Sequence, residues 1–406
     1  MKRVSVIGIS VATAALIMGG CGSSSSGPSA PAETKAATSI DLATVESALS
    51  MLYNGGIAAA GAPASPVKAA VADIKTAIQT KVAASGGYSG GDSYSQTYDC
   101  QISGTRTSSY ESSYDYPAEG GWTETYAYTY RYDHCIDNSS GDVNGEPVNR
   151  YFQNGTYSYS NTATYDNDSN MSKETWSWSD NRSYGYDNNE TTTSRTYTAK
   201  NSGKETWEAD GDYFDATGIP AWSDTWHYSG FNKVVDINSS GKVSGGERNV
   251  YNETWTDSGA QDNSHYKTMA DGFYTHYETD ANGVESVTGG EYYNNFVMEV
   301  YMSGSEENVT INGTYGTTCL GGSVTFKTDP VVQSNQDDYF DGDGAHGSDV
   351  LPYAGTVTVS GSGSATVSFD ANASMYSTVT IVAPDGSATY SRWSDIPVGS
   401  CSSMMP

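Results

Sequence analysis

The sequence predicts a mainly β protein: one large antiparallel sheet, barrel-like or sandwich-like, that is built from repeated hairpins and preceded by a short helical hairpin. A recurring motif is the first observation behind this prediction. A polar Gly turn followed by an apolar-polar-Gly step occurs at 138–146, 238–247 and 285–291, and each copy runs on into Tyr residues. Recurrence of a turn between segments of high strand preference is typical of stacked hairpins.

Aromatic residues at every second position are the second observation. In the segment 122–134, Trp122, Glu124, four tyrosines and His134 alternate with Thr and other polar residues. Alternate residues of a strand point to one face, so the segment predicts a long strand with an aromatic ladder. An acidic-Thr-aromatic triplet also recurs at irregular intervals, which favours strands of varying length. Its copies are Glu124-Thr-Tyr126, Glu174-Thr-Trp176, Glu205-Thr-Trp207, Asp224-Thr-Trp226 and Glu253-Thr-Trp255.

Residues 1–20 have the pattern of an export signal: a basic start, then an apolar run too short to span a bilayer comfortably. The run ends in Met18-Gly19-Gly20-Cys21, which resembles the lipobox of bacterial lipoproteins. The resemblance implies lipidation of Cys21, an anchor in the outer membrane, and a chain that faces the periplasm or the cell surface. The alternative is a cleaved secretory signal with an incidental Cys21. The remainder resembles uncharacterised β-repeat proteins of the envelope.

Residues 21–37 are rich in Ser, Pro and Ala and predict a flexible tether. Residues 38–87 predict a helical hairpin, with apolar stripes at helical spacing in both halves. Thr38 and Asp41 are placed as a capping box for the first helix, and Ser65 is the expected N-cap of the second. We expect the hairpin to cover one end or face of the sheet; a partner protein is the alternative.

The strands divide into two regions by composition. Residues 88–316 are rich in Tyr and Trp. In residues 317–406 aliphatic side chains alternate with polar ones, and this pattern predicts a β-meander or small sandwich. Whether the second region is a separate domain or the closing part of the larger sheet stays open at this point.

The cysteines predict two disulfides. With Cys21 lipidated, Cys100, Cys135, Cys319 and Cys401 remain, and an even number in an exported chain indicates pairing. Three pairings are possible. Cys100–Cys135 and Cys319–Cys401 are preferred because each closes one end of the β region, and each would contribute roughly 3–4.5 kcal/mol. No Cys-x₂-Cys occurs, which argues against a zinc site.

The formal net charge of −28 restricts the partners of this chain. Such a surface repels phosphate backbones, so we expect no nucleic-acid binding. Cations, Ca²⁺ in particular, are the natural counter-species; alternatively, the acidity keeps a Tyr-rich sheet soluble. Disorder is a competing interpretation of this composition, but aromatic residues this dense and regular are unusual in disordered segments.

One acidic loop is the candidate metal site. Carboxylates on a Gly-rich segment suit a hard cation such as Ca²⁺, although Ala345 at the fifth position and the lack of a closing Glu depart from an EF-hand. The alternative is a solvated acidic loop. The candidate ligands are Asp337, Asp338, Asp341, Asp343 and Asp349.

The sequence contains no nucleophile elbow, HExxH, phosphate loop or dinucleotide fingerprint. We therefore expect a non-enzymatic structural or adhesive role through the aromatic face, with a glycan or an envelope protein as partner. A Ca²⁺-dependent carbohydrate-binding module is the first alternative. An envelope glycoside hydrolase is the second, and five copies of the carboxylate–aromatic pair argue against it because a catalytic site occurs once. The candidate stacking residues are Trp122, Trp176, Trp207, Trp226 and Trp255.

Overall fold

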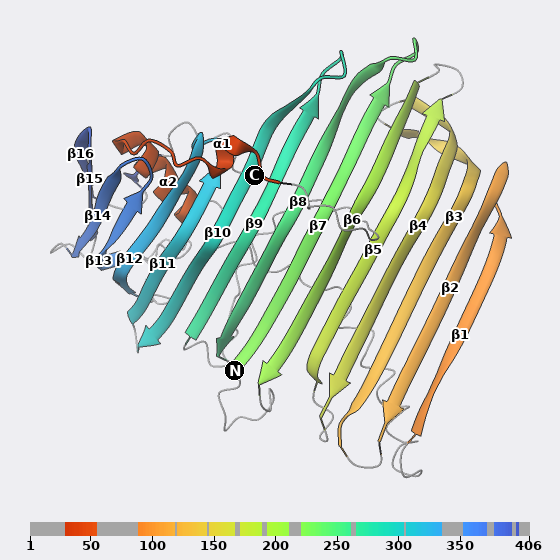
Figure 1. Ribbon diagram of the computed structural model, residues 1–406, viewed down its shortest axis with the longest axis horizontal. Helices are drawn as coiled ribbons and strands as arrows, with labels where there is room; N and C mark the ends of the chain where they lie inside the picture. Colours follow the sequence, from red (N-terminus) through yellow and green to blue (C-terminus); the bar gives the residue numbers. More distant parts are fainter. Residues whose placement is uncertain are drawn as a thin grey trace, which may run out of the picture.

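The computed structural model describes residues 29–54, 88–117, 120–143, 146–166, 171–188, 193–210, 221–260, 265–303, 306–334, 352–371, 377–391 and 395–397. Within them the chain forms one 16-stranded antiparallel sheet, and each strand lies beside the strand that follows it in sequence (Figure 1). The strands are β1 (Tyr88–Asp99), β2 (Ser103–Tyr116), β3 (Trp122–Val143), β4 (Glu146–Tyr165), β5 (Met171–Asn188), β6 (Thr193–Asp210), β7 (Ala221–Ile237), β8 (Val243–Ala260), β9 (His265–Thr279), β10 (Glu285–Ser303), β11 (Glu306–Thr317), β12 (Gly322–Ser334), β13 (Pro352–Ser360), β14 (Ser364–Ala371), β15 (Ser377–Ala383) and β16 (Gly386–Tyr390).

The prediction of a large antiparallel sheet of repeated hairpins is confirmed. The sheet is open, with β1 and β16 at its two ends, so the described strands adopt neither the barrel-like nor the sandwich-like form. Strands β12 to β16 continue the same sheet, so the aliphatic C-terminal region is its closing part.

The recurring motif marks hairpin turns. The second copy, 238–247, contains the turn between β7 and β8, the first lies at the end of β3 and the start of β4, and the third, 285–291, begins β10 directly after its turn. At the second turn the side-chain Oδ1 of Asn238 accepts the N–H groups of Ser240 (3.0 Å) and Lys242 (3.2 Å). At the third, Asp280 Oδ1 accepts those of Asn282 (2.8 Å) and Val284 (2.9 Å). A short acceptor side chain that holds backbone donors two and four residues ahead closes the turn locally, which is why Asn and Asp recur there.

Antiparallel register explains the irregular intervals between the acidic-Thr-aromatic triplets. Four of the five middle threonines align in a single row across the sheet, because each strand reverses direction and the intervals compensate. Hydroxyl groups of neighbouring threonines in the row lie 3.0–3.4 Å apart in three pairs. The row runs across six successive strands as Thr125, Thr162, Thr175, Thr206, Thr225 and Thr256.

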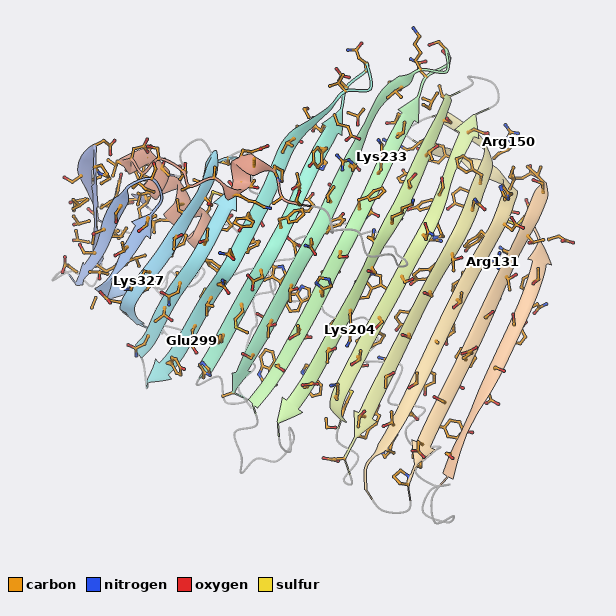
Figure 2. All side chains as sticks on the ribbon, in the orientation of Figure 1. Arg131, Arg150, Lys204, Lys233, Glu299 and Lys327 are labelled. Carbon is orange, nitrogen blue, oxygen red and sulfur yellow. A yellow bond between two sulfur atoms is a disulfide. The ribbon has the colours of Figure 1, made fainter. Side chains whose placement is uncertain are left out.

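The two faces of the sheet differ in chemistry. We call the face that carries the Trp residues the aromatic face, and the face that carries the threonine row the hydroxyl face. The register places seven tryptophans on the aromatic face: Trp122, Trp176, Trp178, Trp207, Trp222, Trp226 and Trp255. Most basic side chains of the strands project from the hydroxyl face, including Arg131, Arg150, Lys204, Lys233 and Lys327, which Figure 2 labels.

Helix α2 (Leu42–Asn54) covers the aliphatic end of the aromatic face, which confirms the first predicted helix. Its buried residues Val45 and Leu49 belong to the same core as Val359 and Val367 on β13 and β14. Asp41 is its N-cap and accepts the N–H of Thr44 at 2.8 Å. Helix burial supplies the apolar side chains that the short C-terminal strands need for a dry core. The second predicted helix lies outside the described residues.

The predicted capping box is not formed by Thr38, whose hydroxyl instead donates to the carbonyl of Leu320 at 2.9 Å. Thr38 belongs to a segment that crosses the sheet. Ala30 is buried against Val250 and Phe273 on the hydroxyl face, and Ala37 forms a parallel bridge with Ser323. Between these contacts lies the short helix α1 (Ala32–Lys35). The part of the expected tether that is described, from residue 29 onward, is therefore docked on the sheet.

Candidate functional site

Rings on the aromatic face stack on one another across neighbouring strands. Trp122 lies parallel to Tyr165 with ring centroids 3.7 Å apart, and Trp226 lies parallel to Trp255 at 6.3 Å. Trp176, Trp226 and Trp255 are only 8%, 6% and 8% exposed. Three of the five predicted stacking residues are thus already covered by protein neighbours, whereas Trp122 and Trp207 are half-buried.

Carboxylates between the rings accept hydrogen bonds from tyrosine hydroxyls. Glu124 is buried, and its two oxygens accept from Tyr116 Oη (2.6 Å) and Tyr126 Oη (3.3 Å). Burial, followed by the bond to Glu124, raises the pKa of Tyr116 well above its usual value. The acid of the triplet therefore serves here as the acceptor that lets tyrosine hydroxyls sit within a covered face.

A second carboxylate cluster lies over β8, β9 and β10. Glu291 accepts hydrogen bonds from Tyr293 Oη (2.5 Å) and Tyr315 Oη (3.4 Å). On β9, Gly272, whose φ is +111°, lies opposite both Glu253 of β8 and Tyr293 of β10, and it places no side chain between them. Burial, and then the charge of Glu291, raises the pKa of Glu253 to about 8. Near neutral pH this carboxyl group is therefore mostly protonated.

An ion pair is buried within the aromatic face at β5. Arg182 Nε donates to Asp180 Oδ2 at 2.6 Å, and the two side chains are 9% and 0% exposed. The guanidinium lies 5.7, 5.3 and 5.3 Å from the ring centroids of Tyr132, Tyr157 and Tyr184. Burial raises the pKa of Asp180 to about 7, against the opposing effect of Arg182. The three tyrosine rings form a cage around this guanidinium, which is the protein's own cation. The role of the cage in this fold is therefore to hold strands β3, β4 and β5 together.

Gly203 provides the space for Trp178, its cross-strand partner on the aromatic face. A Cβ atom at Gly203 would overlap the Trp178 ring, which also contacts Tyr228 with centroids 5.2 Å apart. We predict that Gly203→Val lowers the free energy of unfolding by about 1–3 kcal/mol, because it displaces the ring. Urea unfolding followed by Trp fluorescence measures the loss. Gly245→Val is the matched control, because a Cβ atom there meets nothing closer than the Thr279 carbonyl oxygen at 3.9 Å, an ordinary contact. Equal losses in the two variants would contradict the prediction.

Exposed rings gather at the β1 end of the aromatic face. Tyr94, Tyr98, Tyr128 and Tyr130 are 52%, 39%, 38% and 38% exposed, and Tyr110 lies between Tyr94 and Tyr128 in the same register row. We call these five residues the tyrosine patch. A group of half-wet rings on a rigid sheet is the kind of surface that binds other molecules through stacking and hydroxyl contacts.

The aromatic ladder predicted for 122–134 ends at Tyr132 and does not include His134. His134 has φ +46° at a β-bulge, and the register with β4 shifts between Tyr132 and Cys135. Cys135 therefore joins the aromatic face, while the His134 side chain is 82% exposed. The bulge takes up one residue, so alternation alone places His134 on the wrong face.

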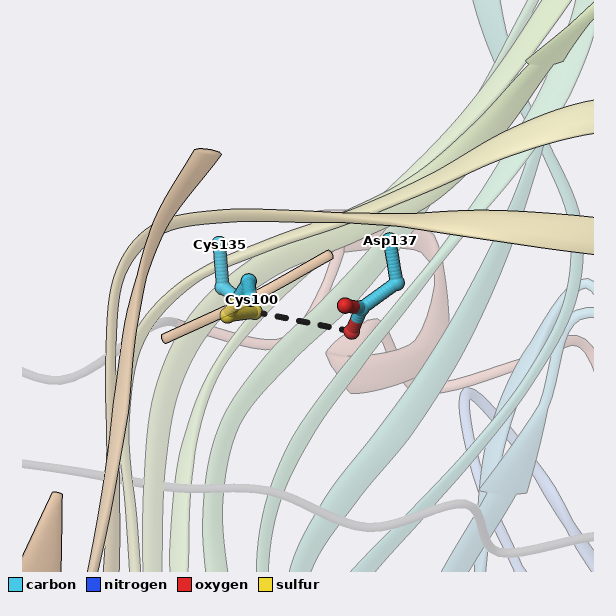
Figure 3. Close-up of side chains that lie close together, drawn as sticks. All are labelled: Cys100, Cys135 and Asp137. Carbon is cyan, nitrogen blue, oxygen red and sulfur yellow. Dashed lines mark hydrogen bonds between the residues drawn. A yellow bond between two sulfur atoms is a disulfide. The ribbon is translucent and has the colours of Figure 1, made fainter. Parts of the chain in front are cut away.

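The predicted disulfide between Cys100 and Cys135 is confirmed. Asp137 lies beside it, with Oδ2 3.7 Å from the Cys135 sulfur (Figure 3). Its other oxygen accepts the N–H of Gln101 at 2.7 Å and so fixes the β1–β2 connection. These three side chains are close enough to surround an ion, but the bonded sulfurs offer no thiolate, so the group is structural. The predicted Cys319–Cys401 pair depends on Cys401, which lies outside the described residues.

Several predicted sites fall on residues that are not described. They are the lipidation site Cys21 and the Ca²⁺ ligands Asp337, Asp338, Asp341, Asp343 and Asp349. Sequence reasoning missed the Asp180–Arg182 pair and the Glu253–Glu291 cluster. Spacing could have indicated the first, since Asp180 and Arg182 continue the alternation of Trp176 and Trp178 onto the aromatic face.

Comparison with protein-family models, curated proteins and solved structures finds no match to this chain. Among the described helices, none has both the length and the apolar content that crossing a membrane requires.

Proposed function

We propose that this chain is a lipid-anchored protein of the bacterial outer membrane with a non-enzymatic structural or adhesive role. The observation that carries the proposal is the tyrosine patch: the aromatic face is covered by its own packing at β5 to β10, yet it stays exposed at β1 and β3. The Cys21 motif supports the anchor. The patch then lies on a rigid sheet that the anchor holds at the membrane, with a glycan or an envelope protein as its partner.

The carboxylates argue for this role over hydrolysis. Glu124 and Glu291 are occupied by tyrosine hydroxyls, and Asp180 is occupied by Arg182. A hydrolase needs two carboxyl groups that flank a bound sugar and are free to exchange protons. The covered Trp176, Trp226 and Trp255 likewise favour packing over glycan stacking, so a carbohydrate-binding role would depend on the tyrosine patch instead.

Adhesion of cells that display the full chain tests the proposal. We expect Tyr128→Ser with Tyr130→Ser to reduce binding to glycan-coated and uncoated surfaces severalfold, because the pair supplies two exposed rings of the patch. Thr125→Ser with Thr129→Ser, on the hydroxyl face of the same strand, is the matched control and should bind as the parent does. Unchanged adhesion of the tyrosine variant at equal surface amounts would contradict the proposed role. Cys21→Ala should release the protein from the outer-membrane fraction.

A further inference from the structure

The two edges of the sheet are unequal. At one end β16 has 5 residues, and its Tyr390 hydroxyl is hydrogen-bonded to Glu46 of α2. At the other end β1 has 12 residues, and every residue from Ser89 to Asp99 is exposed. No described strand pairs with the outer side of β1. A long exposed edge is a template for another strand, and proteins usually protect it with Lys, Pro or a bulge.

Strand β1 carries none of these protections. Its sequence, Tyr-Ser-Gly-Gly-Asp-Ser-Tyr-Ser-Gln-Thr-Tyr-Asp, contains no Lys, Arg or Pro, and its pairing with β2 shows no register shift. The N–H groups of Asp92 and Cys100 point toward β2, where they donate to Ser112 Oγ (3.3 Å) and Gly104 O (3.0 Å). Backbone groups alternate sides along a strand, so the N–H and C=O of the odd-numbered residues from Ser89 to Asp99 point outward.

We propose that β1 pairs with β1 of a second copy of this chain in an antiparallel, twofold arrangement centred on Tyr94. This register makes hydrogen-bonded pairs of the outward residues: Ser93 faces Ser95, Gly91 faces Thr97 and Ser89 faces Asp99 of the other copy. In this register every residue from Ser89 to Asp99 pairs with a residue of the other copy. The second copy is the partner because the strand is complementary to itself: in this arrangement Asp92 faces Gln96 and no acid faces an acid.

The side chains of the aromatic face support the same centre. Tyr94, the most exposed tyrosine of the patch at 52%, meets its twin in a non-hydrogen-bonded pair, where side chains approach most closely. Tyr98 of each copy lies opposite Gly90 of the other, next to Tyr114, which already covers that glycine. Cross-strand partners share a face, so the aromatic faces of the two copies lie on one side and the two tyrosine patches merge. The inference depends on the backbone and side chains of the edge strand, and it stands whatever the patch binds.

Cysteine cross-linking of the full chain tests the pairing and its register. Tyr94→Cys places two sulfurs at a pair whose Cα atoms are about 4.5 Å apart, which suits a disulfide. We expect most of this variant to run at twice the monomer mass on a non-reducing gel after mild oxidation, and the parent chain to run as a monomer. Gln96→Cys should stay monomeric, because its twin is about 14 Å away in this register. Val382→Cys, exposed on β15, reports random collision.

A second test of the pairing introduces like charges on β1. Ser93→Lys with Ser95→Lys, added to Tyr94→Cys, opposes lysines across the pair on the hydroxyl face and should abolish the cross-link. The Cys100–Cys135 disulfide and an unchanged circular dichroism spectrum show that this variant is folded. A monomeric Tyr94→Cys chain, a dimer from Gln96→Cys instead, or equal cross-linking at Val382→Cys would each overturn the proposal. Adhesion is not a readout here, so failure of this test is separate from failure of the proposed function.

Discussion

Replacing Arg182 with leucine will lower the free energy of unfolding by about 3–5 kcal/mol, because it leaves the buried Asp180 carboxylate without its cation. Asp180 is 0% exposed and already has one oxygen, Oδ1, without a hydrogen-bond partner. The leucine also ends the contacts of the guanidinium with Tyr132, Tyr157 and Tyr184. Urea unfolding of the full chain, followed by Trp fluorescence, measures the loss.

Two further variants make this prediction specific. Arg106→Leu removes an exposed arginine that also lies over a tyrosine ring, 5.6 Å from Tyr98, and we expect it to change stability by less than about 1 kcal/mol. Asp180→Leu combined with Arg182→Leu should recover much of the stability that Arg182→Leu loses, since two apolar side chains replace the pair. A loss in Arg182→Leu no greater than in Arg106→Leu would show that the cage does not hold the strands together.

Alternation in the sequence was sufficient to predict the strands and the aromatic face, because period 2 is a property of each strand alone. The turn motif likewise predicted hairpins, since Asn238 closes its turn with its own neighbours and the third copy directly follows the turn that Asp280 closes. The pairing Cys100–Cys135 followed from their positions at one end of the β region. These features are local, or nearly so, and each is therefore readable without knowledge of the register.

Cross-strand neighbours depend on the register, and the register depends on β-bulges that no pattern in the sequence predicts. The bulge at Asn295, with φ +46°, lets Tyr293 and Phe296 share a face although they are three residues apart. Glu253 lies on β8 and Glu291 on β10, and β9 separates the two strands. Their side chains come close only because the register places Glu253 opposite Gly272 of β9. The open form of the sheet was also unpredictable, because alternation is the same in a barrel, a sandwich and an open sheet.

Replacing Glu253 with glutamine will stabilise the fold in alkaline solution and leave it nearly unchanged in mild acid. The folded chain binds a proton at Glu253 with a pKa of about 8, whereas the unfolded value is near 4.5. Below the pKa that Glu253 has in the unfolded chain, its carboxyl group is protonated in both states and does not lower the free energy of unfolding. As the pH rises from 4.5 to 8 the unfolded chain releases its proton first, so stability falls by up to about 1.4 kcal/mol per pH unit, and above 8 the full cost remains.

Glutamine keeps the shape of the protonated acid and cannot ionise, so Glu253→Gln avoids this cost. We expect a gain of about 2–4 kcal/mol at pH 9 and little gain at pH 5, measured by urea unfolding at both values. Glu247→Gln, an exposed acid on the same strand and face, is the matched control and should show no such difference. An equal effect of Glu253→Gln at the two pH values would mean that burial among Trp255, Tyr293 and Glu291 does not raise the pKa of this group. The cluster would then be open to water, and the aromatic face at β8 to β10 would be accessible to ligands in the way the tyrosine patch is.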